Sequence, residues 1–168
     1  MDAYLDIETS YSKEITIIGV YRDDVGLRQL IDKTISPSNI LETLRGVTTI
    51  YTYNGNRFDI PVIAQKTGLN LKNNFTLHDL MFDCWSKKLF GGLKAVERKL
   101  GIARDTAGMD GEDAMRLWED YCLWKDEEAL ARLLKYNGED VVNLKTLREK
   151  LENRNALKSY LGEGSWNF

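Results

Sequence analysis

The order of the hydrophobic patterns constrains the fold of this 168-residue chain more than any other feature. Three apolar and β-branched runs come first, helical patterns then alternate with two further runs, and the second half is helical almost throughout. This order predicts an α/β fold in which helices flank a mixed sheet, followed by a helical C-terminal half. The expected strands cover residues 3–8, 14–21, 27–32, 47–53 and 75–78. The expected helices cover residues 36–45, 58–67, 80–89, 92–100, 112–124 and 127–151.

The composition predicts one soluble domain over residues 1–168. Hydrophobic residues make up 43% of the chain, and no low-complexity segment, repeat or Pro/Gly-rich linker divides it. No apolar run approaches the roughly 20 residues of a membrane span, and Asp2 and Asp6 interrupt the place of a signal peptide. The two cysteines form no CxxC pair, so we expect reduced thiols and a cytoplasmic protein.

Charge and histidine content exclude several classes of protein. The net charge of −3 argues against coating nucleic acid by bulk electrostatics, although a local site can still handle phosphates through bound cations. His78 is the only histidine, which excludes a Cys2His2 zinc finger, an HExxH protease and an HD-type phosphohydrolase. His78 and Asp79 together could bind a metal, but we favour the interpretation that Asp79 caps the next helix.

The sequence DIET places Asp6 and Glu8 at the end of the first expected strand. Alternate residues of a strand point to one face, so the two acids share a face with Tyr4 and lie about 7 Å apart. Carboxylates this close repel each other and resist burial, and a divalent cation such as Mg²⁺ or Mn²⁺ removes both problems. The alternative interpretation is a solvated strand end where two acids occur by chance.

The sequence YNGNRFDIP, from Tyr53 to Pro61, follows an expected strand and precedes an expected helix. Its Asn-Gly pair, which begins at Asn54, predicts a tight turn. Asp59 lies at the helix start, where a carboxylate can cap the helix or ligate a metal. Capping alone leaves the apolar Phe58 in a turn unexplained, although this side chain can also staple the helix to the core.

The sequence YNGED, residues 136–140, lies inside a long helical pattern. Tyr136 and Asp140 are four residues apart and therefore share one face of the helix. An acid on a half-buried face needs a partner, either a metal ion or a lysine or arginine from elsewhere in the chain. Gly138 costs about 1 kcal/mol relative to alanine in a helix, which indicates either a close approach or a kink at this point.

The motifs DIET, YNGNRFD and YNGED, in this order, resemble the three exonuclease motifs of the DnaQ-like superfamily of 3′–5′ exonucleases. The Tyr-x-x-x-Asp spacing matches the DEDDy subtype, because the histidine subtype needs a histidine near residue 135. Residues 91–102 (GGLKAVERKLGI) and 114–121 (AMRLWEDY) resemble YprB-type ribonuclease-H-like proteins. The resemblance extends over about residues 3–150 and implies a ribonuclease-H-like fold with a mixed five-stranded sheet and helices on both sides.

The resemblance implies a metal-dependent 3′–5′ exonuclease with two Mg²⁺ or Mn²⁺ ions in its active site. By this resemblance Asp6 bridges the ions, Glu8 and Asp140 hold the ion that activates the attacking water, and Asp59 reaches the second ion through water. Tyr136 is expected to orient the water, since a phenol with a pKa near 10 is a poor base at neutral pH. The expected partners are single-stranded DNA or RNA 3′ ends; DNA is favoured, although the 2′-hydroxyl contact that separates the two cannot be read from the sequence.

Four further residues are candidates for binding substrate: Thr9, Asn54, Phe58 and Lys94. Phe58 can stack on or wedge a base, and Lys94 belongs with the loop at residues 87–92, which either binds phosphate or simply connects two helices. The tryptophans at 85, 118 and 124 lie in helical patterns and are expected in the core, whereas Trp166 lies in the tail.

Two alternative functions stay open. One is an exoribonuclease of the RNase D-like type, which acts on structured RNA ends. The other is a nucleic-acid-binding or proofreading module within a larger complex, since this fold also occurs in polymerases. The chain begins five residues before Asp6 and ends shortly after its last expected helix. We therefore expect no polymerase, helicase or separate RNA-binding domain, and a protein partner in a repair or processing complex is compatible with this.

Overall fold

Five strands form one mixed sheet in the computed structural model, which describes the backbone of residues 1–161 and the side chains of residues 1–153. The strands are β1 (Asp2–Thr9), β2 (Ile15–Arg22), β3 (Gly26–Ile31), β4 (Thr49–Thr52) and β5 (Thr76–Asp79). Their order across the sheet is β3-β2-β1-β4-β5, so β1 is central. β2 is antiparallel to β1 and β3, whereas β4 is parallel to β1 and β5. The expected mixed five-stranded sheet and its first hairpin are confirmed.

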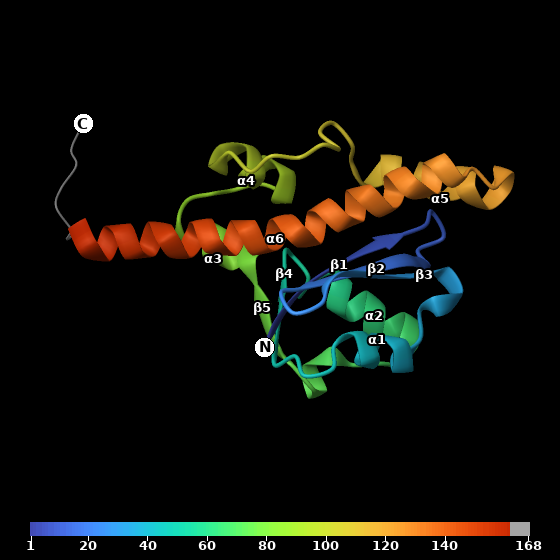
Figure 1. Cartoon of the computed structure of the whole chain (residues 1–168), viewed down its shortest axis with the longest axis horizontal. Helices are drawn as coiled ribbons and strands as arrows, with labels where there is room; N and C mark the ends of the chain where they lie inside the picture. The colour runs from blue at the N-terminus through green and yellow to red at the C-terminus, as the bar shows by residue number, and fades with distance from the viewer. Residues whose placement is uncertain (162–168) are drawn as a thin grey trace.

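Six α-helices and two 3₁₀ segments cover and connect the strands within residues 1–161. The helices are α1 (Pro37–Thr43), α2 (Asp59–Thr67), α3 (Leu80–Ser86), α4 (Leu93–Leu100), α5 (Gly111–Trp124) and α6 (Glu127–Leu161). The 3₁₀ segments are η1 (Asp32–Thr34) and η2 (Leu71–Asn73). Helices α1 and α2 lie on one face of the sheet, whereas α6 crosses the opposite side of the molecule together with α3, α4 and α5 (Figure 1). This is the expected α/β fold with a helical C-terminal half.

The alternation of side chains along β1 divides the core into two sides. The side that packs against α1 and α2 takes three apolar residues of this strand: Ala3, Leu5 and Ile7. The other side takes Tyr4, which packs with buried residues of α3, α4 and α6. Since Asp6 and Glu8 continue the alternation from Tyr4, both acids face the layer that contains α6.

Helix α6 begins where the pattern predicts and continues to Leu161, past the expected end at residue 151. The sequence contains no glycine or proline between residues 139 and 161 to stop it, so the helix extends beyond Leu151, the last buried leucine among the side chains that the structure describes. No helix among the described residues is long and apolar enough to cross a membrane.

Two of the three helical tryptophans lie outside the core, contrary to expectation. Trp85 is 37% exposed because it lies on the outer side of the short helix α3. Trp124 is 75% exposed because α5 ends there, where Lys125 adopts a left-handed backbone conformation. Trp118 is half-buried and packs against a core cluster between α5 and α6, and Trp166 lies outside the described residues.

Candidate active site

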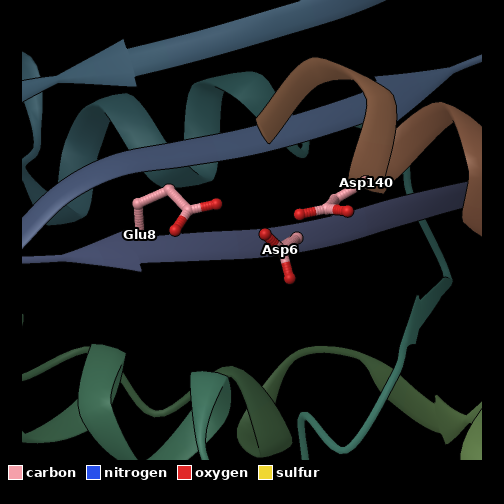
Figure 2. Close-up of side chains that lie close together, drawn as sticks. All are labelled: Asp6, Glu8 and Asp140. Atoms are coloured by element: carbon pink, nitrogen blue, oxygen red, sulfur yellow. The ribbon is translucent and has the colours of Figure 1, made fainter. Parts of the chain in front are cut away.

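Three carboxylates from opposite ends of the sequence meet over the centre of the sheet. Asp6 and Glu8 project from β1, and Asp140 projects from α6 (Figure 2). One carboxylate oxygen of each residue lies within 4.8 Å of those of the other two. Glu8 and Asp140 are buried and Asp6 is half-buried. The acids of the first and third motifs therefore form one cluster.

Two close approaches bring α6 onto the sheet beside this cluster. Asp6 pairs with Gly19 of β2, and a Cβ atom on that glycine would lie 2.2 Å from the Oδ1 of Asn137. A Cβ atom on Gly138 would lie 3.0 Å from the Cδ2 of Leu27 on β3. The helix continues through Gly138, so this glycine serves close packing between α6 and the sheet.

A fully buried amide holds the carboxylate of Asp6. The Nδ2 of Asn137 donates a hydrogen bond to the Oδ2 of Asp6 at 3.1 Å. The Oδ1 of Asn137 accepts a hydrogen bond from the Nε2 of Gln29 at 3.0 Å, and the same nitrogen donates to the backbone oxygen of Leu134 at 2.8 Å. Rotation of the Asn137 amide would leave buried polar atoms without partners, at a cost of about 1–3 kcal/mol. The orientation of Asp6 is therefore set by β3 and α6 together.

Asp59 lies apart from the 4.8 Å group but lines the same cleft. It is the first residue of α2, it is buried, and its Oδ1 accepts a hydrogen bond from the backbone N–H of Ile7 at 3.0 Å. That N–H lies between Asp6 and Glu8 in the chain, so the bond ties the start of α2 to the acidic segment of β1. Side-chain capping of α2, one of the two expected roles, is not what the structure shows.

The acids lie in an open cleft of about 410 Å³. Three of the four candidate substrate-binding residues line it: Asn54, Phe58 and Lys94. Phe58 is 44% exposed, so its ring faces solvent at the edge of the cleft. Thr9, the fourth candidate, lines a neighbouring groove of about 440 Å³, and Phe58 forms part of both. Thr9 therefore lies outside the cleft that the other three candidates line, and shares its groove with Phe58.

Burial and mutual repulsion raise the pKa of the acids in the cleft. At Asp6 the loss of solvation is the largest cause, the charges of Asp140, Asp59 and Glu8 add to it, and the pKa lies well above its ordinary value. Loss of solvation followed by the charge of Asp140 raises the pKa of Glu8 to about 8. Burial raises the pKa of Asp59 to about 7, although its backbone hydrogen bonds oppose this. The cleft therefore disfavours several simultaneous negative charges unless a cation is present.

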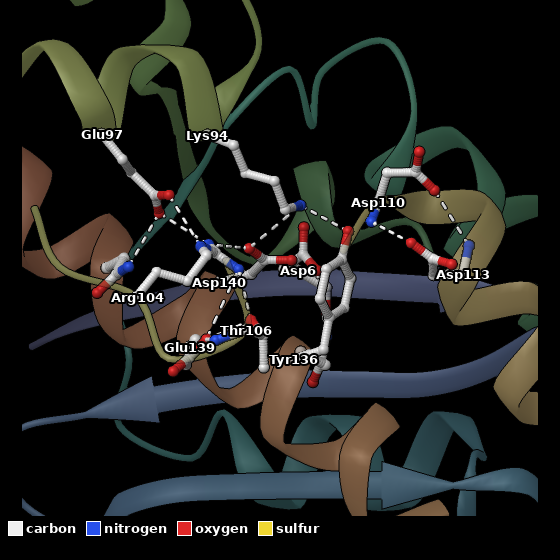
Figure 3. Close-up of polar contacts among 12 residues, drawn as sticks. Asp6, Lys94, Glu97, Arg104, Thr106, Asp110, Asp113, Tyr136, Glu139 and Asp140 are labelled. Atoms are coloured by element: carbon white, nitrogen blue, oxygen red, sulfur yellow. Dashed lines mark hydrogen bonds and ion pairs between the residues drawn. The ribbon is translucent and has the colours of Figure 1, made fainter. Parts of the chain in front are cut away.

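Two basic residues reach the cluster through Asp140. Arg104, from the connection between α4 and α5, donates hydrogen bonds from its Nη2 to Asp140 and, at 2.8 Å, to the Oε1 of Glu97 (Figure 3). Its Nε donates to the Oε2 of Glu97 at 3.0 Å. The Nζ of Lys94 lies 3.8 Å from the Oδ1 of Asp140. Burial raises the pKa of Asp140, and the charges of Lys94 and Arg104 oppose that rise.

Tyr136 is buried one helical turn before Asp140 and lines the cleft, as its position in the motif predicts. Its phenolic oxygen accepts a hydrogen bond from the Nζ of Lys94 at 2.5 Å, and the same nitrogen lies 4.2 Å from the centre of its ring. Burial, followed by the charges of Asp140, Glu8 and Asp6, raises the pKa of the phenol above its ordinary value of 10.0. Tyr136 is therefore protonated at neutral pH.

Asp79 holds the turn that carries the second motif. Its Oδ1 accepts hydrogen bonds from the backbone N–H groups of Asn54 at 2.7 Å and Met81 at 3.1 Å, and its Oδ2 accepts one from Asn56 at 3.2 Å. The expected capping of α3 by Asp79 is confirmed, and the link to the turn at Asn54 is an additional role. His78 pairs with Asp83 at 2.5 Å rather than with any residue of the cleft.

Sequence reasoning missed three polar residues that shape the site: Glu97, Arg104 and Asn137. Asn137 lies inside the YNGED motif, so its position between Tyr136 and Asp140 in the chain was the available signal. Arg104 lies in an irregular segment between two helices, and no local pattern connects it with Asp140. Its role becomes visible only when the segment is placed against α6.

The donor set fits a hard divalent cation. Carboxylate oxygens are the ligands that Mg²⁺ and Mn²⁺ prefer, and three of them converge here from Asp6, Glu8 and Asp140. Among the side chains that the structure describes, neither Asp6 nor Glu8 forms an ion pair with a lysine or arginine. A divalent cation would offset both the loss of solvation and the mutual repulsion that raise the pKa values of these two acids.

Residues 3–152 match the family model of the RNase H superfamily, and the chain belongs to that superfamily. The expected ribonuclease-H-like fold is thus confirmed. The fold is also similar to the structure of the family B DNA polymerase from the hyperthermophilic archaeon Pyrobaculum calidifontis, with a TM-score of 0.69 and 17% sequence identity. This match covers 89% of the present chain but only 24% of that polymerase chain. No curated protein matches the chain by sequence.

Proposed function

We propose that this protein is a metal-dependent 3′–5′ exonuclease of the DEDDy type that acts on single-stranded nucleic acid, with DNA favoured over RNA. The observation that carries the proposal is the grouping of Asp6, Glu8 and Asp140 within 4.8 Å in an open cleft. Tyr136 and Asp59 line the same cleft, as the resemblance to the DnaQ-like exonucleases implies. We assign this activity to a single domain over residues 1–168.

Asp6, Glu8 and Asp140 are the residues that would hold the metal, and Asp59 faces them from the start of α2. Two Mg²⁺ or Mn²⁺ ions would supply an activated water and charge stabilisation for the departing 3′ oxygen. The other roles in the reaction, positioning the water and holding the nucleotide, fall to side chains of the protein.

Tyr136 is suited to position the attacking water. Lys94 donates its hydrogen bond to the phenolic oxygen, so the phenolic proton remains available for a hydrogen bond into the cleft. A phenol with a raised pKa keeps that proton at neutral pH and therefore acts as a donor rather than as a base. Asn137 contributes to the geometry of the site by fixing the carboxylate of Asp6.

The edge of the cleft is suited to hold the terminal nucleotide. The half-exposed ring of Phe58 offers a stacking surface for a base, a contact worth about 1–3 kcal/mol per base in other proteins. Asn54 belongs to the turn that Asp79 holds, and Lys94 of α4 adds a positive charge to the lining of the cleft. A single strand with a free 3′ end can reach the acids through this opening.

A cleavage assay tests the proposal directly. Single-stranded DNA and RNA oligonucleotides labelled at the 5′ end are incubated with Mg²⁺, Mn²⁺ or EDTA. Wild-type protein should produce a metal-dependent ladder that shortens from the 3′ end. Asp140→Asn should abolish it, whereas Asp23→Asn, which removes an exposed carboxylate outside the cleft, should not.

The outcomes separate the candidate functions. Ordinary activity in Asp140→Asn, or a ladder that persists in EDTA, contradicts the proposed site. Cleavage of RNA alone supports the exoribonuclease alternative. The match to about a quarter of a polymerase chain favours a second candidate, a module that works within a larger DNA-processing complex. Metal binding without cleavage of either oligonucleotide by the folded protein would support that candidate and its need for a protein partner.

A further inference from the structure

Helix α3 presents two exposed aromatic rings next to the cleft. Met81 of this helix lines the cleft, and Trp85 lies one helical turn beyond it on the same side of the helix. The rings of Phe82 and Trp85 meet edge to face, with their centres 5.5 Å apart and an interplanar angle of 87°. Phe82 is 45% exposed and Trp85 is 37% exposed. The buried contacts of α3 are made by other residues, so these rings are not needed to fill the core.

Arg57 connects these rings to the edge of the cleft. The centre of its guanidinium group lies 5.9 Å from the centre of the Trp85 ring, and its neighbour in the chain is Phe58. Among the described side chains Arg57 forms no ion pair, so its charge is available to a ligand. Arg57, Phe82 and Trp85 together form what we call the α3 patch, and Phe58 and Met81 make this patch continuous with the cleft.

We propose that the α3 patch binds the bases of the single strand that lie upstream of the terminal nucleotide; this inference rests on the proposed exonuclease function. Aromatic rings stack on every kind of base, and an arginine supplies a contact to phosphate or to a base plane. The charge of Arg57 complements the polyanion, and Arg57 directly precedes Phe58, which lines the cleft. The occupant is therefore a strand whose 3′ end lies among the acids of the cleft.

The groove on the other side of Phe58 offers a competing path, but a poorer one. It is lined by Thr9, Tyr11 and Lys66, among other residues. The ammonium group of Lys66 already pairs with Glu14 at 2.5 Å, and Tyr11 is the one aromatic side chain besides Phe58 among the residues that line this groove. Lys13 also lines this groove and has no ion pair among the described side chains, so a free cation does not distinguish the two paths. The α3 patch differs in having two touching rings beside its arginine, so it is better suited to stacked bases.

Fluorescence anisotropy tests the path of the strand. The probes are labelled single-stranded oligonucleotides of about 12 and about 3 nucleotides, with Ca²⁺ in place of Mg²⁺ and with intact length checked after binding. Trp85→Ala should raise the Kd for the longer probe at least fivefold. The difference in affinity between the longer and the shorter probe should therefore become smaller. Trp85→Phe, which keeps a ring, should bind within about twofold of wild type and shows that the fold tolerates a change at this position.

Two matched controls decide between the paths. Trp124→Ala removes an exposed tryptophan at the end of α5 and should leave the Kd unchanged. Equal binding of the longer probe by Trp85→Ala and Trp124→Ala would overturn the inference, and so would a loss caused by Tyr11→Ala but not by Trp85→Ala. If wild-type protein cleaves the 3′ end while Trp85→Ala binds normally, the patch is wrong and the exonuclease stands. If the wild-type protein cleaves neither oligonucleotide but Trp85→Ala weakens binding of the longer probe, the inference about the patch stands and the proposed activity is wrong.

Discussion

Arg104 forms a buried ion pair with Asp140, one of the three acids of the proposed metal site. Both side chains are 6% exposed, and the same guanidinium group also binds the buried carboxylate of Glu97. The protein thus supplies a cation of its own next to the cluster. Because the pair is buried, loss of either partner leaves a charge without compensation in a poorly solvated place.

Replacement of Arg104 should therefore destabilise the protein. We expect Arg104→Met to lower the free energy of unfolding by about 3–5 kcal/mol, as measured by urea denaturation in EDTA. Arg116→Met is the matched control, since Arg116 pairs with Asp113 at the surface and its loss should cost less than about 1 kcal/mol. Mg²⁺ should restore more stability to Arg104→Met than it adds to wild type. Equal stability of the two variants would contradict the buried role of Arg104.

The stability of the metal-free protein should fall as the pH rises. The folded-state pKa of Glu8 is raised from 4.5 to about 8, so the folded state binds more protons than the unfolded state between these values. The stabilisation is complete below about pH 4.5 and is lost as the pH approaches 8, with a slope of at most about 1.4 kcal/mol per pH unit for one proton.

Glu8→Gln removes this titration, and its metal-free stability should depend less on pH and exceed that of wild type at pH 8. Urea denaturation over a pH series in EDTA measures both curves. Glu149→Gln, an exposed change on α6, should follow wild type. Parallel curves for Glu8→Gln and wild type would show that Glu8 titrates normally.

Tyr136→Phe should slow the proposed reaction without stopping it. The variant keeps the ring under Lys94 and loses only the hydroxyl, so kcat should fall by about 100-fold while KM changes little. Steady-state cleavage of the labelled oligonucleotide measures both constants, and Tyr121→Phe on α5 serves as the control. Unchanged kcat would remove Tyr136 from the reaction, whereas complete loss of activity would give its hydroxyl an essential chemical role.

Two glycine substitutions should differ in their cost to stability. Gly19→Ala places a methyl group 2.2 Å from the buried Oδ1 of Asn137, so it should destabilise the protein by about 1–3 kcal/mol and weaken the bond to Asp6. Gly138→Ala meets only the end of the Leu27 side chain at 3.0 Å and gains about 1 kcal/mol of helix propensity, so the net change should be small. Thermal unfolding of both variants checks this contrast, and equal losses of stability would contradict the packing described for Asn137.

The local patterns of the sequence predicted most of the fold. The strand and helix order, the shared face of Asp6 and Glu8, and the shared face of Tyr136 and Asp140 all follow from the periods of strands and helices. The errors lie where a helix is short or where it ends. Trp85 belongs to a helix of seven residues and Trp124 ends its helix. At neither position does the helical period determine which side of the helix faces the core.

The identity of the acids, and which of them share a face, could be predicted from the sequence, because local geometry places neighbours along one strand or helix. Three contacts arise only when the chain folds: Asp140 meets Asp6 and Glu8, Asn137 holds Asp6, and Arg104 reaches Asp140. These contacts depend on where α6 crosses the sheet. The close approach of Asn137 to Gly19 constrains that crossing, and no period within a single segment encodes it.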